Sequence, residues 1–153
     1  VKDEHAALVI VFDLEKAVME LKKSFKLRYV IHQGEIDTQL NKEEAYGMLG
    51  SGLTEARQRL TNMKSTKERF SISLQKKDHA ENLGLMFQVL QAISDQWTAA
   101  QQKIVAIFLE LDDYRVVAKK LKKDPTTIWR RKRSLMIEAY KSLRTLMLKT
   151  AQP

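Results

Sequence analysis

The spacing of apolar residues divides this chain into a mixed first half and a helical second half. Ala6–Phe12 is a short continuous apolar run, which predicts a buried strand. The residues that follow repeat at helical spacing, so we expect a helix capped by Asp13. Alternating side chains predict strands within 26–40 and 69–74, with a helix between them at 53–63. The first part of the chain is therefore expected to be an α/β region.

Beyond residue 78 the apolar residues have a helical period throughout. One stripe consists of Leu83, Met86, Phe87, Leu90, Ile93 and Trp97, and a second of Ile104, Ile107, Phe108 and Leu111. We therefore predict two domains, an incomplete α/β domain over 1–78 and an all-helical domain over 79–153. The fold class predicted is α+β.

A short helix followed by a tight turn is predicted in the helical half. An earlier helix, which ends near residues 112–113, starts after Thr98, and Thr98 is a good N-cap for it. Residues 114–121 form the short helix, in which the small Ala118 lets another helix cross closely. Lys122 and Lys123 make the turn, although Lys122 occupies a position that commonly holds glycine.

The helix after this turn has a strong start signal. Asp124 can cap it, and Pro125 suits the first helical position. Ile128 is expected to point back at the preceding helix. Arg131 is also expected near that helix, and its charge is unusual at such a position. The pattern predicts a long helix from Pro125 to Lys149, and a helix-turn-helix over about 98–149.

The positive charge is concentrated in this same region. The chain has a net charge of +8, and residues 114–134 hold nine basic side chains against a single acid, Asp124. This stretch alone accounts for the whole excess, which is typical of a polyanion-binding site. A solvated charged face is the alternative.

The helix-turn-helix geometry predicts which side chains contact DNA. The second helix of such a motif lies in the major groove, and its first residues reach base edges. Arg can bind guanine through two hydrogen bonds, and Thr offers a methyl group and a hydroxyl. The expected base-facing residues are Thr126, Thr127, Trp129, Arg130 and Arg133, with Arg131 beside them. The expected phosphate contacts are Lys119, Lys120, Lys122 and Lys123.

Several segments in order resemble the SatD family of bacterial proteins. They are Arg28–Ile36, Tyr46–Gly50, Ala56-Arg57, Trp97-Thr98-x-x-Gln101, Val117-Ala118-x-x-Leu121 and Ile128-x-Arg130-Arg131, with Lys2–His5 similar to an acidic box ahead of them. The resemblance covers nearly the whole chain and implies a palm-like α/β region followed by a helix-turn-helix. Members of this family usually have some fifty more N-terminal residues, so we expect this chain to be a fragment of such a protein.

The α/β region is also similar, more distantly, to nucleotide cyclases. That similarity implies a partial ferredoxin-like palm, an antiparallel sheet with helices on one face. It does not imply cyclase activity, because Thr54 and Gln58 stand where cyclases carry Asn and Arg, and the metal-binding first strand is missing. A lone acid such as Asp3 does not hold two metal ions.

Other candidate chemistry is sparse. The chain has no cysteine, which argues against a thiolate metal site or a cysteine nucleophile. His5, His32 and His79 lack ligand spacing, so no metal site is expected. Glu35 and Asp37 could share a cation or be simply solvated, and the loop at 50–52 could bind phosphate at a helix N-terminus. No catalytic constellation and no cofactor are predicted.

These observations favour a cytoplasmic DNA-binding protein that regulates transcription. A homodimer is expected, since single helix-turn-helix units usually act on paired half-sites. The helix that carries Leu143, Leu146 and Met147 could supply the dimer face, or it could pack on the helix of residues 80–97.

No membrane segment is predicted, and the palm could sense a nucleotide. One alternative is a nucleotide-binding, cyclase-like protein without its catalytic strand. The others are RNA or polyanion binding and a protein-interaction module that docks on the transcription machinery.

Overall fold

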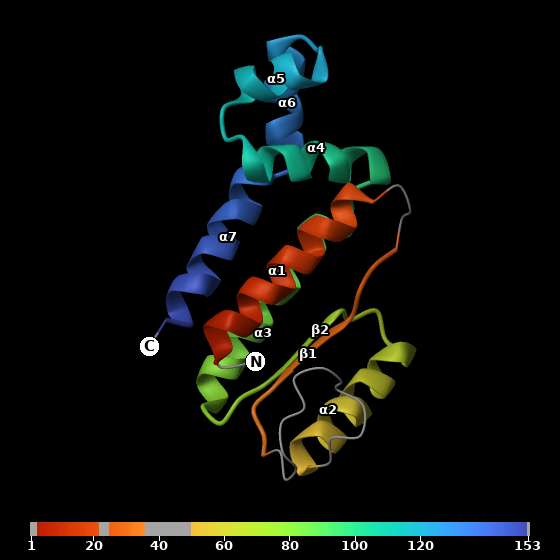
Figure 1. Cartoon of the computed structure of the whole chain (residues 1–153), viewed down its shortest axis with the longest axis vertical. Coiled ribbons are helices and arrows are strands. Elements are labelled where there is room, and N and C mark those ends of the chain that lie inside the picture. The colour runs from red at the N-terminus through yellow and green to blue at the C-terminus, as the bar shows by residue number, and fades with distance from the viewer. Residues whose placement is uncertain (1–2, 22–24, 36–49, 153) are drawn as a thin grey trace, which may run out of the picture. The chain divides into compact units, whose positions relative to one another are not determined.

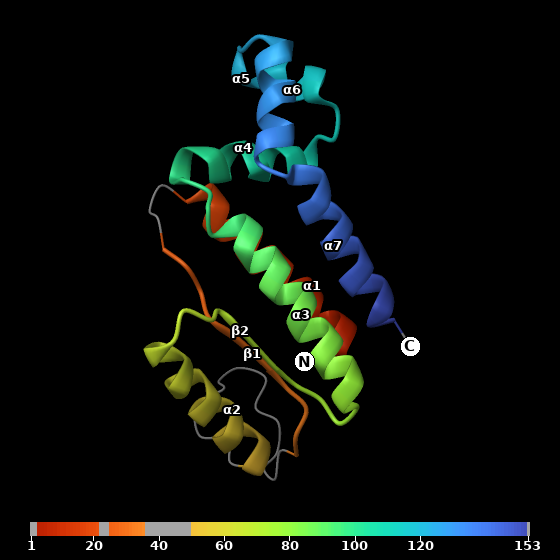
Figure 2. The same cartoon turned by 180° about the vertical axis from the view of Figure 1, so that it is seen from behind.

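The computed structural model describes residues 3–21, 25–35 and 50–152, which form two compact units (Figures 1 and 2). The helical unit comprises residues 1–26 and 89–153, and the α/β unit comprises residues 27–88. The described part of the chain is mostly helical with a small sheet, an α+β composition as expected. None of the described helices is both long and apolar enough to cross a membrane.

The two units divide the chain differently from the boundary expected at residue 78. Residues 1–26, predicted to belong to the α/β domain, are part of the helical unit. The helical unit contains α1 (Glu4–Glu20), the end of α3 (Lys77–Ser94), α4 (Ala99–Glu110), α5 (Tyr114–Leu121), α6 (Pro125–Ser134) and α7 (Ile137–Thr150). The α/β unit contains β1 (Tyr29–His32), α2 (Ser51–Asn62), the 3₁₀ turn Met63–Ser65, β2 (Phe70–Ser73) and the start of α3.

The predicted strand at Ala6–Phe12 is wrong, because this run lies inside α1. The helix begins at Glu4 and is capped by Asp3, whose side chain accepts a hydrogen bond from the Ala6 N–H at 2.8 Å, and not by Asp13. Its buried residues are Ala7, Leu8, Val11, Phe12, Glu15, Val18 and Met19, which recur at helical spacing. A continuous apolar run is compatible with either element, and here the wide buried face of α1 makes it a helix.

The helical unit buries α1 against α4 and α7. Figures 1 and 2 both show α1 and α7 side by side. The Nδ1 atom of His5 lies 3.1 Å from the backbone oxygen of Leu148, and the guanidinium of Arg144 lies 4.9 Å from the ring centroid of Phe12. The helix α7 therefore packs within this unit, and Met147 is buried while Leu146 is exposed.

The helix predicted to run from Pro125 to Lys149 is two helices in the structure. It breaks between α6 and α7 at Met136, which adopts the left-handed conformation with φ of 53°. Leu135 and Ile137 are buried on either side of the break. The sequence has no glycine or proline at this point, so burial of these two side chains, and not a local breaker, sets the break.

The α/β unit is a β–α–β arrangement in which β1 and β2 pair in parallel. The distant cyclase similarity implied an antiparallel sheet, and the two described strands do not have that arrangement. One face of the pair packs on α3, since the rings of Tyr29, Phe70 and Phe87 stack in sequence with centroids 5.4 and 4.4 Å apart. The other face meets α2, where His32 Nε2 lies 3.5 Å from Glu55 Oε2.

Other expected elements of this unit are confirmed. The alternation predicted within 26–40 holds for β1, whose Tyr29 and Ile31 are buried. The strand at 69–74 and the helix at 53–63 correspond to β2 and α2 within a few residues. Glu35 lies beyond the end of β1, and Asp37 falls outside the described residues.

Candidate nucleic-acid interface

The helices α5 and α6 are joined by a three-residue turn, Lys122–Asp124, and cross each other beyond α4 (Figures 1 and 2). Lys122 occupies the left-handed region, with φ of 52° and ψ of 47°. The N–H of Lys123 donates to the carbonyl of Ala118 at 3.0 Å, which closes the end of α5. Lysine therefore adopts the conformation for which glycine is favoured at this position.

Capping residues fix the ends of both helices. Asp113 accepts from the Arg115 N–H at 2.7 Å at the start of α5. Asp124 accepts from the Thr127 N–H at 2.9 Å, and Pro125 is the first residue of α6, as expected. Thr98 and Gln101 form a reciprocal capping box at the start of α4.

A small apolar core holds α5 and α6 together. Val117, Ala118 and Ile128 are each 1% exposed or less. The expectation that Ile128 points back toward α5 and that Ala118 sits at the crossing is consistent with this burial. Because Ile128 is buried, the opposite side of α6 faces solvent.

The solvent side of α6 presents a stripe of side chains at helical spacing. Successive residues of a helix are about 100° apart, so positions i, i+3, i+4 and i+7 share a face. In α6 these are Thr126, Trp129, Arg130 and Arg133, and all four are exposed. We call this set the α6 stripe. Arg131 is also exposed but lies on the flank of α6 away from the stripe, as its one-residue offset from Arg130 requires.

The exposed indole of Trp129 is part of a cation–π contact. The Arg133 guanidinium carbon lies 5.0 Å from the Trp129 ring centroid. Trp129 is 42% exposed, so it is not a core residue. Stacking of this kind restricts the guanidinium to one region and keeps its N–H groups free to donate.

Most of the lysines expected to contact phosphate are exposed and unpaired. Lys119, Lys122 and Lys123 are exposed, and none of them forms an ion pair with another described residue. Lys120 differs, because its Nζ lies 3.4 Å from Glu110 Oε2. Glu110 is in turn bound by Lys16 at 3.0 Å, and Lys16 Nζ also lies 3.7 Å from Glu20 Oε1, so Lys120 belongs to a four-residue network on the surface.

Lys132 has a structural role although it lies within the basic run. Its Nζ lies 2.5 Å from Glu138 Oε1, donates to the Asp112 carbonyl at 3.2 Å and sits 5.6 Å from the Phe108 ring centroid. Only 18% of its side chain is exposed. Lys132 therefore links α6 to α4 and α7, and its ammonium group is held by these contacts.

Two carboxylates beside this surface have lowered pKa values. A hydrogen bond from Lys16, followed by its charge and by Lys120, lowers the pKa of Glu110. A hydrogen bond and the charge of Lys141, with Lys132 adding to them, lower the pKa of Asp112. The Lys16 pKa is correspondingly raised by its hydrogen bond to Glu110. Glu110 and Asp112 are exposed and Lys16 is half-buried, so solvent screens these effects.

An open pocket of about 380 Å³ adjoins the α6 stripe. Its lining residues are Tyr114, Trp129, Lys132, Arg133, Met136 and Glu138. Sequence reasoning missed this pocket, because it depends on the break at Met136. It also missed the partners of Lys132, for which the only signal was the acid Glu138 six residues later.

Among the described residues, no group of three or more His, Asp or Glu side chains is placed to hold a metal ion. The exposed surface of α5, α6 and their turn instead carries cations, hydroxyl groups and the Trp129 ring. Comparisons with protein-family models, with curated proteins and with solved structures find no match to this chain.

Proposed function

We propose that α5 and α6 form a helix-turn-helix that binds double-stranded DNA, and that the chain is a cytoplasmic regulator of transcription. The observation that carries the proposal is the α6 stripe, which begins at the capped N-terminus of α6 and lies opposite the buried Ile128. The N-terminal half of a recognition helix reads base edges in the major groove. We further propose that the chain is related to the SatD family, which several segments of its sequence resemble and which has a helix-turn-helix in the same place.

Different residues of this surface have different roles in the proposal. Arg130 and Arg133 read guanine through paired hydrogen bonds, and Thr126 contacts a base through its methyl group or hydroxyl. The cation–π contact with Trp129 orients Arg133 for this role. Thr127 contributes less, because its hydroxyl donates to Asp124 Oδ1 at 3.3 Å within the cap.

The turn lysines supply affinity without sequence preference. Lys122 and Lys123 lie between the two helices, where the backbone of DNA passes when α6 enters the groove. Lys119 and Arg131 extend this cationic surface. Lys120 contributes less than its neighbours, since binding a phosphate would compete with its ion pair to Glu110.

The proposal is tested by selecting duplexes from a random pool and measuring their affinity by fluorescence anisotropy. Arg130→Ala is expected to weaken the selected duplex by about 1–3 kcal/mol and a random duplex much less. Lys122→Ala is expected to weaken both duplexes alike. Lys64→Ala, which removes an exposed lysine from the α/β unit, is the matched control and leaves both affinities unchanged. Equal effects of Arg130→Ala and Lys64→Ala would contradict the proposal.

The exposed apolar residues beside the stripe favour a second candidate, docking of an acidic protein. Trp129 and Met136 are 42% and 51% exposed and line one pocket with Arg133. Aromatic, Met and Arg side chains are enriched at protein interfaces. Absence of binding to any duplex at low salt would favour this function over the first.

A further inference from the structure

Trp129 is the aromatic member of the α6 stripe, whose other members are a threonine and two arginines. It is the fifth residue of α6, in the half of the helix that reaches base edges in the proposed complex. The buried Ile128 next to it already joins α6 to α5. Packing of the two helices therefore does not account for a second large apolar side chain, which is left exposed among the arginines.

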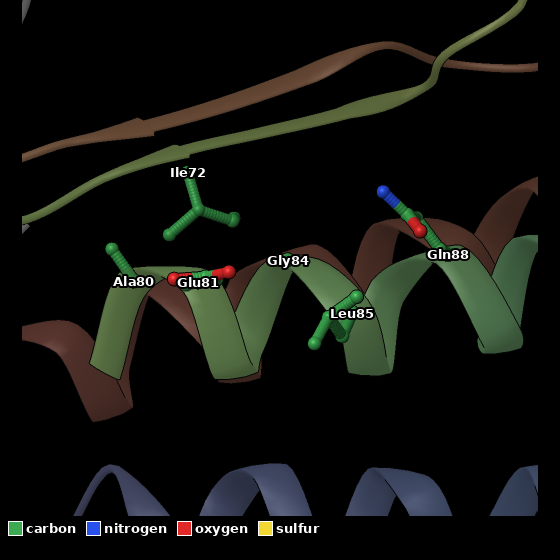
Figure 3. A pocket seen from close by; sticks show the side chains of 6 residues that line it. All are labelled: Ile72, Ala80, Glu81, Gly84, Leu85 and Gln88. Carbon is green, nitrogen blue, oxygen red and sulfur yellow. The ribbon is translucent and has the colours of Figure 1, made fainter. Parts of the chain in front are cut away.

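The exposed indole borders an open recess whose lining is unusual for this chain. The pocket of about 330 Å³ between β2 and α3 is lined by aliphatic side chains with Glu81 and Gln88, and by no aromatic ring (Figure 3). The pocket beside the α6 stripe is lined instead by two aromatic rings, those of Tyr114 and Trp129, and by the exposed Met136. Trp129 thus belongs to an exposed apolar surface and is not an isolated side chain.

The contact with Arg133 holds the indole in place and joins it to a hydrogen-bond donor. Arg133 follows Trp129 by one helical turn, and helical side chains lean toward the N-terminus, so its guanidinium reaches back over the ring. The guanidinium carbon and the ring centroid are 5.0 Å apart. Successive bases of one DNA strand are about 3.4 Å apart, so these two touching groups can reach neighbouring bases.

Thymine is the base whose edge suits an indole. In the major groove the other bases present hydrogen-bond donors and acceptors, whereas thymine also presents its 5-methyl group. An indole has a single N–H donor and a large apolar ring, so it cannot form the paired hydrogen bonds by which arginine reads guanine. It can bury a methyl group against its ring.

We propose that Trp129 recognises the 5-methyl group of a thymine that adjoins the guanine read by Arg133. This inference rests on the proposed function, and it adds a specificity-determining residue to the two arginines. The DNA site then contains a thymine next to a guanine on one strand. Cytosine is disfavoured in place of the thymine because it brings a polar amino group and no methyl group to the ring.

The test replaces the thymines of the selected duplex with deoxyuridine, one at a time, and measures binding of the full chain by fluorescence anisotropy. Uracil pairs as thymine does and lacks only the methyl group. At a thymine beside a guanine, the replacement should weaken binding by about fourfold, the value of one buried methyl group. In Trp129→Ala the thymine and uracil duplexes should bind equally, because the ring that contacts the methyl group is gone.

Two further variants separate the role of the ring from a general loss of affinity. Trp129→Phe retains an apolar ring at this position and should keep most of the preference for thymine over uracil. Val116→Ala is the matched control, because it removes an exposed apolar side chain of α5 that lies outside the α6 stripe. It should leave the preference unchanged.

The outcomes distinguish this inference from the function on which it rests. Tight binding of the selected duplex with no response to any thymine replacement would overturn the role of Trp129 and leave the DNA-binding proposal standing. A response to uracil that persists in Trp129→Ala would do the same. If no duplex binds, the proposed function fails and this inference fails with it.

Discussion

The indole N–H of Trp97 donates a hydrogen bond to the backbone carbonyl of Leu135 at 3.1 Å, across 38 residues of sequence. The Trp97 ring also contacts Tyr140, with centroids 5.0 Å apart and ring planes inclined by 60°. Leu135 ends α6, and Met136 follows in the left-handed conformation. Trp97 thus connects the end of α3 to the junction between α6 and α7.

Replacing Trp97 with phenylalanine is expected to destabilise the helical unit. The substitution leaves the buried Leu135 carbonyl without this donor, which costs about 1–3 kcal/mol. Trp129→Phe is the matched control at the other tryptophan, whose side chain is exposed, and should change the free energy of unfolding little. Urea unfolding followed by circular dichroism measures both. Equal stabilities of the two variants would contradict the role assigned to Trp97.

Caps and short-range alternation in the sequence correctly predicted the elements whose limits depend on neighbouring residues. Asp124 and Pro125 marked the start of α6, and the alternation through Tyr29 and Ile31 marked β1. The run Ala6–Phe12 was assigned wrongly, because a helix with a wide buried face has no clear period over seven residues. Whether such a face exists depends on the helices around it, and the local sequence does not contain that information.

The same distinction applies to the candidate site. Trp129 was expected among the base-facing residues and is exposed, while its neighbour Ile128 is buried. The structural role of Lys132 was not expected, since Asp112 and Phe108 are some twenty residues away in sequence. The break at Met136 was missed for a related reason, because tertiary burial of Leu135 and Ile137 stabilises it without a glycine or proline.

Met136→Gly is expected to stabilise the chain. A non-glycine residue in the left-handed region costs about 1–2 kcal/mol, part of which is returned by the greater freedom of glycine when unfolded. Met136 is 51% exposed, so little packing is lost. The expected net gain is about 0.5–1 kcal/mol in the free energy of unfolding. Met136→Ala keeps the left-handed penalty and serves as the control; a gain of the same size there would contradict the explanation.

Two glycines of the α/β unit are expected to respond in opposite ways to alanine. A Cβ on Gly52 would lie 2.8 Å from the Glu35 carbonyl oxygen and from the Gly34 carbonyl carbon, where α2 approaches the end of β1. Gly52→Ala should therefore cost about 1–3 kcal/mol. Gly84→Ala meets open space inside α3 and should gain about 0.5–1 kcal/mol in helix propensity. Thermal unfolding of dilute, monomeric protein measures both, and a shift of the same sign in each would refute this account of the glycines.

The ion pairs around Glu110 and Asp112 predict a stability that rises with pH in the acidic range. Their pKa values are lowered in the folded chain by Lys16 and by Lys141 respectively. The unfolded chain therefore binds more protons than the folded chain in acid. The contribution of the two carboxylates to the free energy of unfolding is complete above the pKa values that they have in the unfolded chain. It is lost as the pH falls through their lowered pKa values in the folded chain. Lys16→Met should remove the larger share of the dependence that Glu110 contributes and leave the smaller share that Lys120 supplies. The effect is small because the groups are exposed. Unchanged pH dependence of unfolding in Lys16→Met would contradict the assignment.

The central claim, that α5 and α6 bind the DNA backbone and bases, is tested most directly by the salt dependence of binding to one duplex. Binding through phosphates makes the logarithm of the association constant fall linearly with the logarithm of salt concentration, by roughly 0.9 for each phosphate neutralised. We predict a steep slope that becomes shallower by about two when Lys122 and Lys123 are both replaced by alanine. A duplex affinity independent of salt, or a slope unchanged in that double variant, would contradict the claim.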